Sequence, residues 1–200
     1  GGSGYLFYSP EMNERAREQW QLEAELRQAL KSDQLLLHYQ PKVSLRSGRI
    51  VGAEALIRWN HPAQGMIPPD RFIPLAEETG LIFELGSWIL EAACRQIRVW
   101  LDNGRSMLPI AVNLSARQFD AQLPERLQAA IKRHDVPCEM LILEITESLL
   151  VRGPESVIPI MNKLVAMGFA LSLDDFGTGY SSLAYLKKFP ITTLKIDRTF

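Results

Sequence analysis

Apolar positions in the first third of the chain follow two different spacings. Between residues 11 and 31 they recur on one side of a helical turn, with Glu and Arg around them, which predicts an amphipathic helix with Trp20, Leu22, Leu26, Ala29 and Leu30 on its apolar side. Residues 35–45 and 50–59 are extended runs separated only by Arg46 to Arg49. Because that connection is too short for a crossover helix, we expect these two strands to pair antiparallel.

From residue 70 onward, helical and extended patterns alternate. The helical patterns cover 70–78, 83–103, 123–134, 156–167 and 180–188, and the extended ones cover 109–114, 140–145, 169–174 and 193–196. Such alternation is typical of an α/β fold with a parallel sheet or a barrel. Together with the two earlier runs, it predicts six strands, of which the first is reversed.

Length and composition favour a single reduced domain. Two hundred residues suit one domain, and a net charge of −1 gives no indication of the basic surface that a nucleic-acid polymer needs. Cys94 and Cys138 are too few for a disulfide framework, and no signal peptide or run of 18 apolar residues is present. We therefore expect a cytoplasmic, soluble domain, with an anchor elsewhere in a longer parent protein left open.

Polar side chains follow short apolar runs at several predicted strands. Glu54, Asn113 and Glu144 each follow such a run, and Asp174 and Asp175 follow Leu171 to Leu173 before a turn built on Gly177 and Gly179. One acidic strand end is commonly a helix cap, but four strands that deliver oxygen donors to one rim of a parallel sheet indicate a ligand site. These hard donors suit Mg²⁺, Mn²⁺ or Ca²⁺ rather than Zn²⁺ and could hold one ion, or two that share Asp174. The scattered residues His38, His61 and His134 lack ligand spacing.

Two basic residues lie close to this predicted rim. Lys195 stands between apolar Leu194 and Ile196, so we expect it to reach the acids and to hold a nucleophilic water or neutralise developing charge. The structural alternative is an ion pair between Lys195 and Asp197. Arg58 shares a strand face with Glu54 and suits a phosphate oxygen, the alternative being a salt bridge at the strand end.

These motifs together resemble the EAL domain family of cyclic di-GMP phosphodiesterases. The resemblance covers residues 30–200 and rests on Tyr39-Gln40-Pro41, Glu54-Ala55-Leu56-Ile57-Arg58-Trp59, Asn113-Leu114-Ser115, Glu144 to Ser148, Asp174 to Leu183 and Lys195 to Arg198. It implies a modified (β/α)₈ TIM-like barrel with one antiparallel strand. It also divides the chain into a linker and helix over 1–30, which could follow a GGDEF or sensor domain or begin with an engineered scar, and an EAL domain over 31–200.

The resemblance implies a role for each motif. Glu54, Asn113, Glu144 and Asp174 would ligate a first divalent ion, Asp175 would help to hold a second, and Lys195 would orient the attacking water. Glu147 would anchor the loop 176–182, and the substrate contacts would be Gln40, Leu56 and Arg58. The implied reaction is hydrolysis of cyclic di-GMP to linear pGpG with Mg²⁺ or Mn²⁺, inhibited by Ca²⁺, in a homodimer.

One departure from the family concerns the end of the sequence. It stops at Phe200, before the last two strands of the family's barrel and a glutamate expected at the second ion. Six strands cannot close an eight-stranded barrel, so we expect the 200-residue chain to be poorly active. Two alternatives to an active enzyme are an inactive EAL domain that only binds cyclic di-GMP and a purely structural or dimerisation module.

Overall fold

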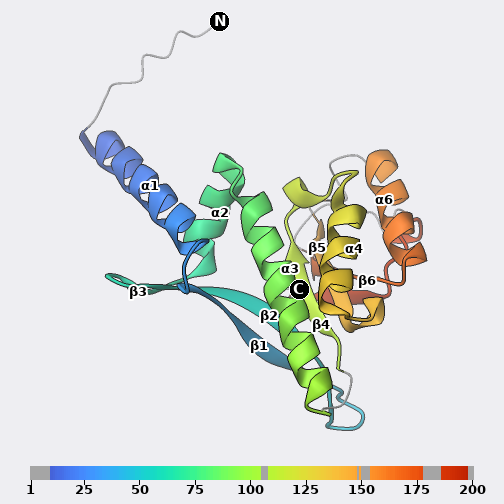
Figure 1. The fold of residues 1–200 in the computed structure, drawn as a ribbon. Helices are drawn as coiled ribbons and strands as arrows, with labels where there is room; N and C mark the ends of the chain where they lie inside the picture. The colour runs from blue at the N-terminus through green and yellow to red at the C-terminus, as the bar shows by residue number, and fades with distance from the viewer. Residues whose placement is uncertain (1–9, 105–107, 148, 150–153, 178–185, 198–200) are drawn as a thin grey trace, which may run out of the picture.

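A computed structural model describes residues 10–104, 108–147, 149, 154–177 and 186–197. Within them, a seven-stranded sheet is covered on its outer side by helices (Figure 1). The strands are β1 (Leu35–Val43), β2 (Ile50–His61), β3 (Gly65–Ile67), β4 (Ile110–Leu114), β5 (Leu141–Thr146), β6 (Ala170–Phe176) and β7 (Thr193–Ile196). The helices are α1 (Pro10–Ala29), α2 (Pro69–Thr79), α3 (Ile82–Asp102), α4 (Leu123–His134) and α6 (Pro154–Ala166), with short 3₁₀ turns η1 (Ala116–Gln118) and η2 (Cys138–Met140).

The sheet has the order β1-β2-β4-β5-β6-β7, with β3 added to the far end of β2. β1 and β2 pair antiparallel, as the short connection predicts, and β2, β4, β5, β6 and β7 are parallel to one another. The predicted α/β class with a mostly parallel sheet is therefore confirmed, and the described strands form part of a barrel. Most of the predicted helix over 180–188, residues 180–185, lies outside the described residues.

The prediction of six strands was wrong by one. β3 pairs antiparallel with β2 through Trp59, Asn60 and His61. Its three residues are too short to show an alternating pattern, so periodicity could not reveal it. The same pairing explains why β2 continues two residues beyond the predicted end at Trp59.

Two hydrophobic clusters hold the sheet to its helices. The larger one joins β4, β5 and β6 to α3, α4 and α6, and the smaller one joins α1 and α2 to the outer half of β2. At the centre of the smaller cluster, the fully buried Trp59 makes an edge-to-face contact with Phe72, with 5.7 Å between ring centroids. The interior of each cluster is apolar, so the polar side chains of the strands are left to the opposite face of the sheet.

The N-terminal helix α1 packs only through its second half. Leu22, Leu26 and Ala29 are buried against α2, as the helical spacing predicts. Trp20, which the same spacing assigns to the apolar side, is 72% exposed, so the helical spacing was wrong for this residue. None of the helices in the described part of the chain has the length and apolar character that a membrane crossing requires.

Candidate active site

Three carboxylates from three strands meet on the inner face of the sheet. Glu54 on β2, Glu144 on β5 and Asp174 on β6 each offer one oxygen, and these oxygens lie within 4.8 Å of one another. Glu54 pairs with Ala111 of the parallel strand β4, one residue before the last pair between these two strands, Ala55 with Val112. All three residues therefore lie toward the carboxyl end of the parallel part of the sheet, where α/β folds place ligand chemistry.

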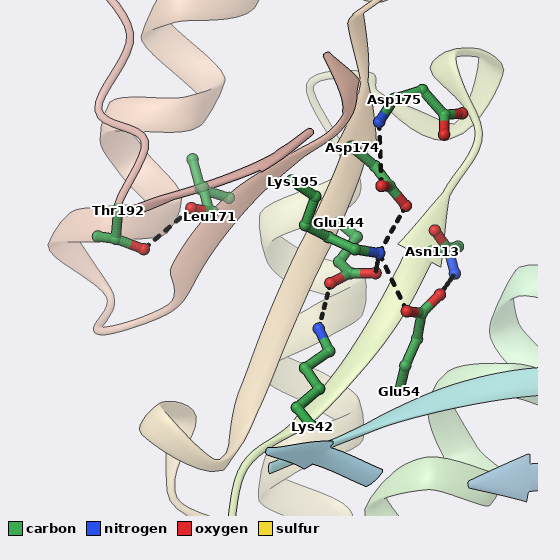
Figure 2. A network of polar contacts seen from close by, with 9 residues as sticks. All are labelled: Lys42, Glu54, Asn113, Glu144, Leu171, Asp174, Asp175, Thr192 and Lys195. Carbon is green, nitrogen blue, oxygen red and sulfur yellow. Dashed lines mark hydrogen bonds and ion pairs between the residues drawn. The ribbon is translucent and has the colours of Figure 1, made fainter. Parts of the chain in front are cut away.

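The ammonium of Lys195 occupies the middle of these carboxylates. Its Nζ donates to Asp174 Oδ2 at 2.7 Å, to Glu144 Oε2 at 2.8 Å and to Glu54 Oε2 at 3.0 Å (Figure 2). Lys195 thus faces the acids, as predicted. The alternative interpretation assumed an ion pair with Asp197, whereas the structure shows hydrogen bonds from Lys195 to three carboxylates. A cation surrounded by three carboxylate oxygens marks the place where positive charge is best stabilised.

The second oxygen of each carboxylate is held by a different donor. Asn113 Nδ2 donates to Glu54 Oε1 at 2.9 Å, and the backbone N–H of Asp175 donates to Asp174 Oδ1 at 3.0 Å. Lys42 Nζ, from β1, donates to Glu144 Oε1 at 2.5 Å. Each carboxylate is consequently fixed at its outer oxygen and presents a single oxygen to the common centre (Figure 2).

The contacts within this cluster favour an ionised Glu54 and a protonated Lys195. Burial of Glu54 opposes its ionisation, but the hydrogen bonds from Asn113 and Lys195 outweigh burial and lower the pKa of Glu54. Burial likewise opposes the charge on Lys195, and its bonds to Asp174, Glu144 and Glu54 more than compensate, so its pKa is raised. Removing the Lys195 ammonium would leave Glu54 and Asp174 without a directly bonded cation among the described residues.

Asp175 lies beside the cluster and outside it. Its carboxylate is not one of the three clustered groups, and it points away from them in Figure 2. Its backbone has a positive φ of 54°, followed by Gly177 at 102°, so the chain turns sharply where the sequence predicts a turn. Burial, followed by the charges of Asp174 and Asp197, raises the pKa of Asp175. A role for Asp175 at a second ion remains a prediction.

Glu147 follows β5 and is 3% exposed. Its Oε2 accepts a hydrogen bond from the backbone N–H of Gly177 at 3.1 Å. This contact joins Glu147 to the first residues of the loop 176–182, which is the connection that the predicted anchoring role needs. Thr178 to Ser182 lie outside the described residues.

A cavity of about 340 Å³ adjoins the cluster. It is lined by Asn113, by Leu56 and Arg58 from β2, and by side chains of α2 and α3 that are mostly apolar but include Glu77. Arg58 donates to the carbonyl of Ile57 at 2.8 Å, and it makes no ion pair with another residue in the described ranges, so the predicted salt bridge at the strand end is not seen. Gln40 lies directly opposite Glu54 on β1 and is exposed.

The three histidines make no contact with the cluster. His38 is exposed on β1, His61 ends β2 with its Nε2 3.3 Å from Glu25, and His134 ends α4 with its Nε2 2.7 Å from Glu91. This agrees with the absence of ligand spacing among them. Lys42 is the site residue that the sequence analysis missed. The available signal was the hairpin register, because Lys42 shares a strand face with Gln40, which lies opposite Glu54.

The donor set fits a divalent ion of the hard type. Its ligand atoms are carboxylate oxygens, with the amide group of Asn113 beside them, and oxygen donors suit Mg²⁺, Mn²⁺ or Ca²⁺ better than Zn²⁺. The three inner oxygens already surround a cation, the Lys195 ammonium. A divalent ion bound by these oxygens would take the place of that ammonium.

Fold and site together define a partly closed α/β barrel with an acidic, metal-type centre at the carboxyl ends of its parallel strands. A family model described as the EAL domain matches residues 23–200. The chain therefore belongs to the EAL domain family, and the resemblance seen in its motifs is confirmed.

Several relatives align with the whole chain. It is 53% identical over 201 residues to the bifunctional diguanylate cyclase/cyclic di-GMP phosphodiesterase MucR of Pseudomonas aeruginosa, which covers 100% of this chain and 29% of MucR. It is 44% identical to the cyclic di-GMP phosphodiesterase NbdA of the same organism, covering 100% of this chain and 26% of NbdA. The chain thus spans less than a third of the length of these curated relatives.

Solved structures give the same family. The PaMucR phosphodiesterase in complex with c-di-GMP superposes with a TM-score of 0.86 at 53% identity, covering 90% of this chain and 73% of that one. The cGMP-bound form of the EAL enzyme Bd1971 superposes with a TM-score of 0.84 at 35% identity, covering 94% of this chain and 52% of the other.

Proposed function

We propose that this chain carries the catalytic face of a cyclic di-GMP phosphodiesterase, which hydrolyses one phosphodiester bond of the cyclic dinucleotide to give linear pGpG. The observation that carries the proposal is the convergence of Glu54, Glu144 and Asp174, each with one oxygen directed at a common centre. Support also comes from relatives named as cyclic di-GMP phosphodiesterases and from a related structure in complex with c-di-GMP.

Mg²⁺ or Mn²⁺, held by Glu54, Asn113, Glu144 and Asp174, would supply the Lewis acid that phosphodiester hydrolysis requires. The phosphates of cyclic di-GMP are anionic and would be repelled by the three carboxylates in the absence of positive charge. The ammonium of Lys195, once the ion takes its place between the acids, could hydrogen-bond a water or neutralise charge that develops on the phosphate.

The cavity beside the cluster suits the remainder of the ligand. Arg58 lies on its wall with a guanidinium that no carboxylate in the described residues neutralises, and such a group can contact a phosphate oxygen. Leu56 and the apolar side chains of α2 and α3 offer a surface for a flat purine base. Gln40, opposite Glu54, would contact the ligand from the other side of the cluster.

The setting of the domain is proposed from its relatives and composition. The name of MucR combines a cyclase with a phosphodiesterase, which supports a GGDEF or other signalling domain before α1 in the parent protein. We further expect the domain to act in the cytoplasm with reduced cysteines, and to form a homodimer as the family resemblance implies.

The test is product analysis with purified protein. Cyclic di-GMP is incubated with the chain in Mg²⁺, Mn²⁺, Ca²⁺ or EDTA, and the products are separated by chromatography. We expect linear pGpG with Mg²⁺ or Mn²⁺, less with Ca²⁺ and none in EDTA, with a faster rate in a version extended through the remaining barrel strands.

Two variants make this test specific. Glu54→Ala removes a central carboxylate and should abolish the product, whereas Glu125→Ala, at an exposed ion pair with Lys163 on the outer helices, should behave as the unaltered chain does. Product formation that survives Glu54→Ala contradicts the proposal. Tight binding of cyclic di-GMP with no product in any ion favours the inactive receptor instead.

A further inference from the structure

Glu144 is the most buried of the three carboxylates, with a side chain that is 0% exposed. Its two oxygens face two different lysines: Oε2 accepts from Lys195 at the centre, and Oε1 accepts from Lys42 on β1. An ion that replaces the Lys195 ammonium reaches Oε2, while Oε1 stays bonded to Lys42. Lys42 thus helps to determine which oxygen of Glu144 an ion can bind.

The position of Lys42 in the sheet allows this reach. Its Cα lies opposite that of Gly52 in the β1–β2 ladder, two residues before Glu54, so no side chain of the neighbouring strand stands beside it. Gly52 is itself required there, because a Cβ at this position would lie 2.9 Å from the carbonyl oxygen of Pro109. The Lys42 side chain crosses to β5 and is 31% exposed.

We propose that Lys42 is a positioning residue that makes the site favour Mg²⁺ over Ca²⁺, by holding Glu144 Oε1 so that Glu144 offers one oxygen and not two. Mg²⁺ takes single oxygens in an octahedral arrangement, whereas Ca²⁺ accepts more ligands and can bind a carboxylate through one or both oxygens. The inference rests on the proposed metal-dependent function and deepens it, since it assigns ion preference to a residue outside the predicted ligand set.

The charge balance of the site also supports the role proposed for Lys42. The three carboxylates carry three negative charges, which one divalent ion and one ammonium neutralise in full. Lys195 occupies the position of the ion, so Lys42 is the ammonium that stays in contact with Glu144 after the exchange. The oxygens of Glu54 and Asp174 are held by neutral donors, the Asn113 amide and the Asp175 backbone.

Lys42→Met tests the proposal, because it keeps the length of the side chain and removes the donor. Calorimetric titration with Mg²⁺ and with Ca²⁺ gives a dissociation constant for each ion, and their ratio is the readout. We expect the preference for Mg²⁺ over Ca²⁺ to fall by about tenfold or more, the scale seen when partners behind metal ligands are removed. Lys42→Arg, which keeps a charged donor, should retain the preference.

The control is Lys163→Met, which removes a lysine from an outer ion pair with Glu125 and should leave the ratio unchanged. If Lys42→Met does not fold, Lys42→Gln replaces it with a shorter, uncharged side chain, and the ratio should move in the same direction. A lysine that only neutralises Glu144 would change both affinities by the same factor, and an unchanged ratio overturns the inference alone. An unaltered chain that binds neither ion overturns the proposed function together with it.

Discussion

Replacement of Lys195 by methionine is the most informative single change at the cluster. The variant keeps the length and most of the volume of the side chain and removes its charge. In the unaltered chain the Lys195 ammonium lies 2.7–3.0 Å from Asp174, Glu144 and Glu54. Without it, three carboxylates remain close together with Lys42 as the lysine still bonded to one of them.

The expected cost follows from the geometry. Two unit charges 4.8 Å apart repel by about 3 kcal/mol at an effective dielectric constant of about 20, and three such pairs exist in the cluster. Partial protonation and rotation of the acids will relieve much of that repulsion. We therefore expect the free energy of unfolding to fall by about 3–5 kcal/mol, the usual effect of removing one partner from a buried charge cluster.

Thermal unfolding in EDTA at neutral pH measures this loss. For a domain of this size, 1 kcal/mol corresponds to about 2–4 °C, so the melting temperature should fall by about 6–20 °C. Mg²⁺ or Mn²⁺ should then raise the melting temperature of Lys195→Met by more than that of the unaltered chain, because the ion no longer competes with the ammonium.

The matched control is Lys163→Met, which removes a lysine from an exposed pair and should cost about 0–1 kcal/mol. An unchanged melting temperature of Lys195→Met in EDTA would refute the electrostatic account of the cluster. A metal-induced rise that is no larger than in the unaltered chain would refute the idea that ion and ammonium occupy the same place.

Three further predictions concern other parts of the molecule. A Cβ at Gly86 would lie 1.6 Å from Gln118 Nε2, so Gly86→Ala should displace the Gln118 amide that caps η1. We expect the free energy of unfolding to fall by about 1–2 kcal/mol. Denaturant unfolding that shows no loss of stability would contradict this. Burial raises the pKa of the Cys94 thiol to about 12. At pH 8 a disulfide reagent should therefore label the half-buried Cys138 quickly and Cys94 slowly. Equal labelling rates would count against the buried position of Cys94. The pKa of Glu54 is below its ordinary value of 4.5, so ionised Glu54 adds stability that is complete above pH 4.5 and is lost as the pH falls through the lowered pKa. Glu54→Gln should therefore make the free energy of unfolding less dependent on pH below 4.5. An unaltered pH profile would argue against the ionised cluster.

Much of the candidate site could be predicted because strand geometry is regular. In parallel strands the carboxyl ends share one edge, so polar residues that end apolar runs, such as Asn113, Glu144 and Asp174, are brought together whatever the loops do. The reversed first strand followed from the length of the connection at Ser47 and Gly48, which no crossover helix could span. These features depend on backbone geometry, which can be predicted from the spacing of apolar and polar residues and from the lengths of the connections.

Other features depend on where a side chain points and what it contacts, and the sequence pattern could not predict them. Lys42 is isolated among the residues of a predicted strand, and its contact with Glu144 joins positions 102 residues apart, across the two strands β2 and β4. Adjacent residues such as Asp174 and Asp175 look equivalent in a sequence. On the sheet they point to different sides, so the carboxylate of Asp174 alone of the two joins Glu54 and Glu144.

The central claim is that the inner oxygens of Glu54, Glu144 and Asp174 form a cation site at which a divalent ion displaces an ammonium. Anomalous diffraction from crystals of the chain grown with Mn²⁺ tests it most directly, because the signal locates the ion and the same map shows Lys195. We predict one Mn²⁺ bonded to the three oxygens that now contact Lys195, with the ammonium moved away from at least one of them. Mn²⁺ bound elsewhere, with Lys195 still bonded to all three carboxylates, would contradict the account.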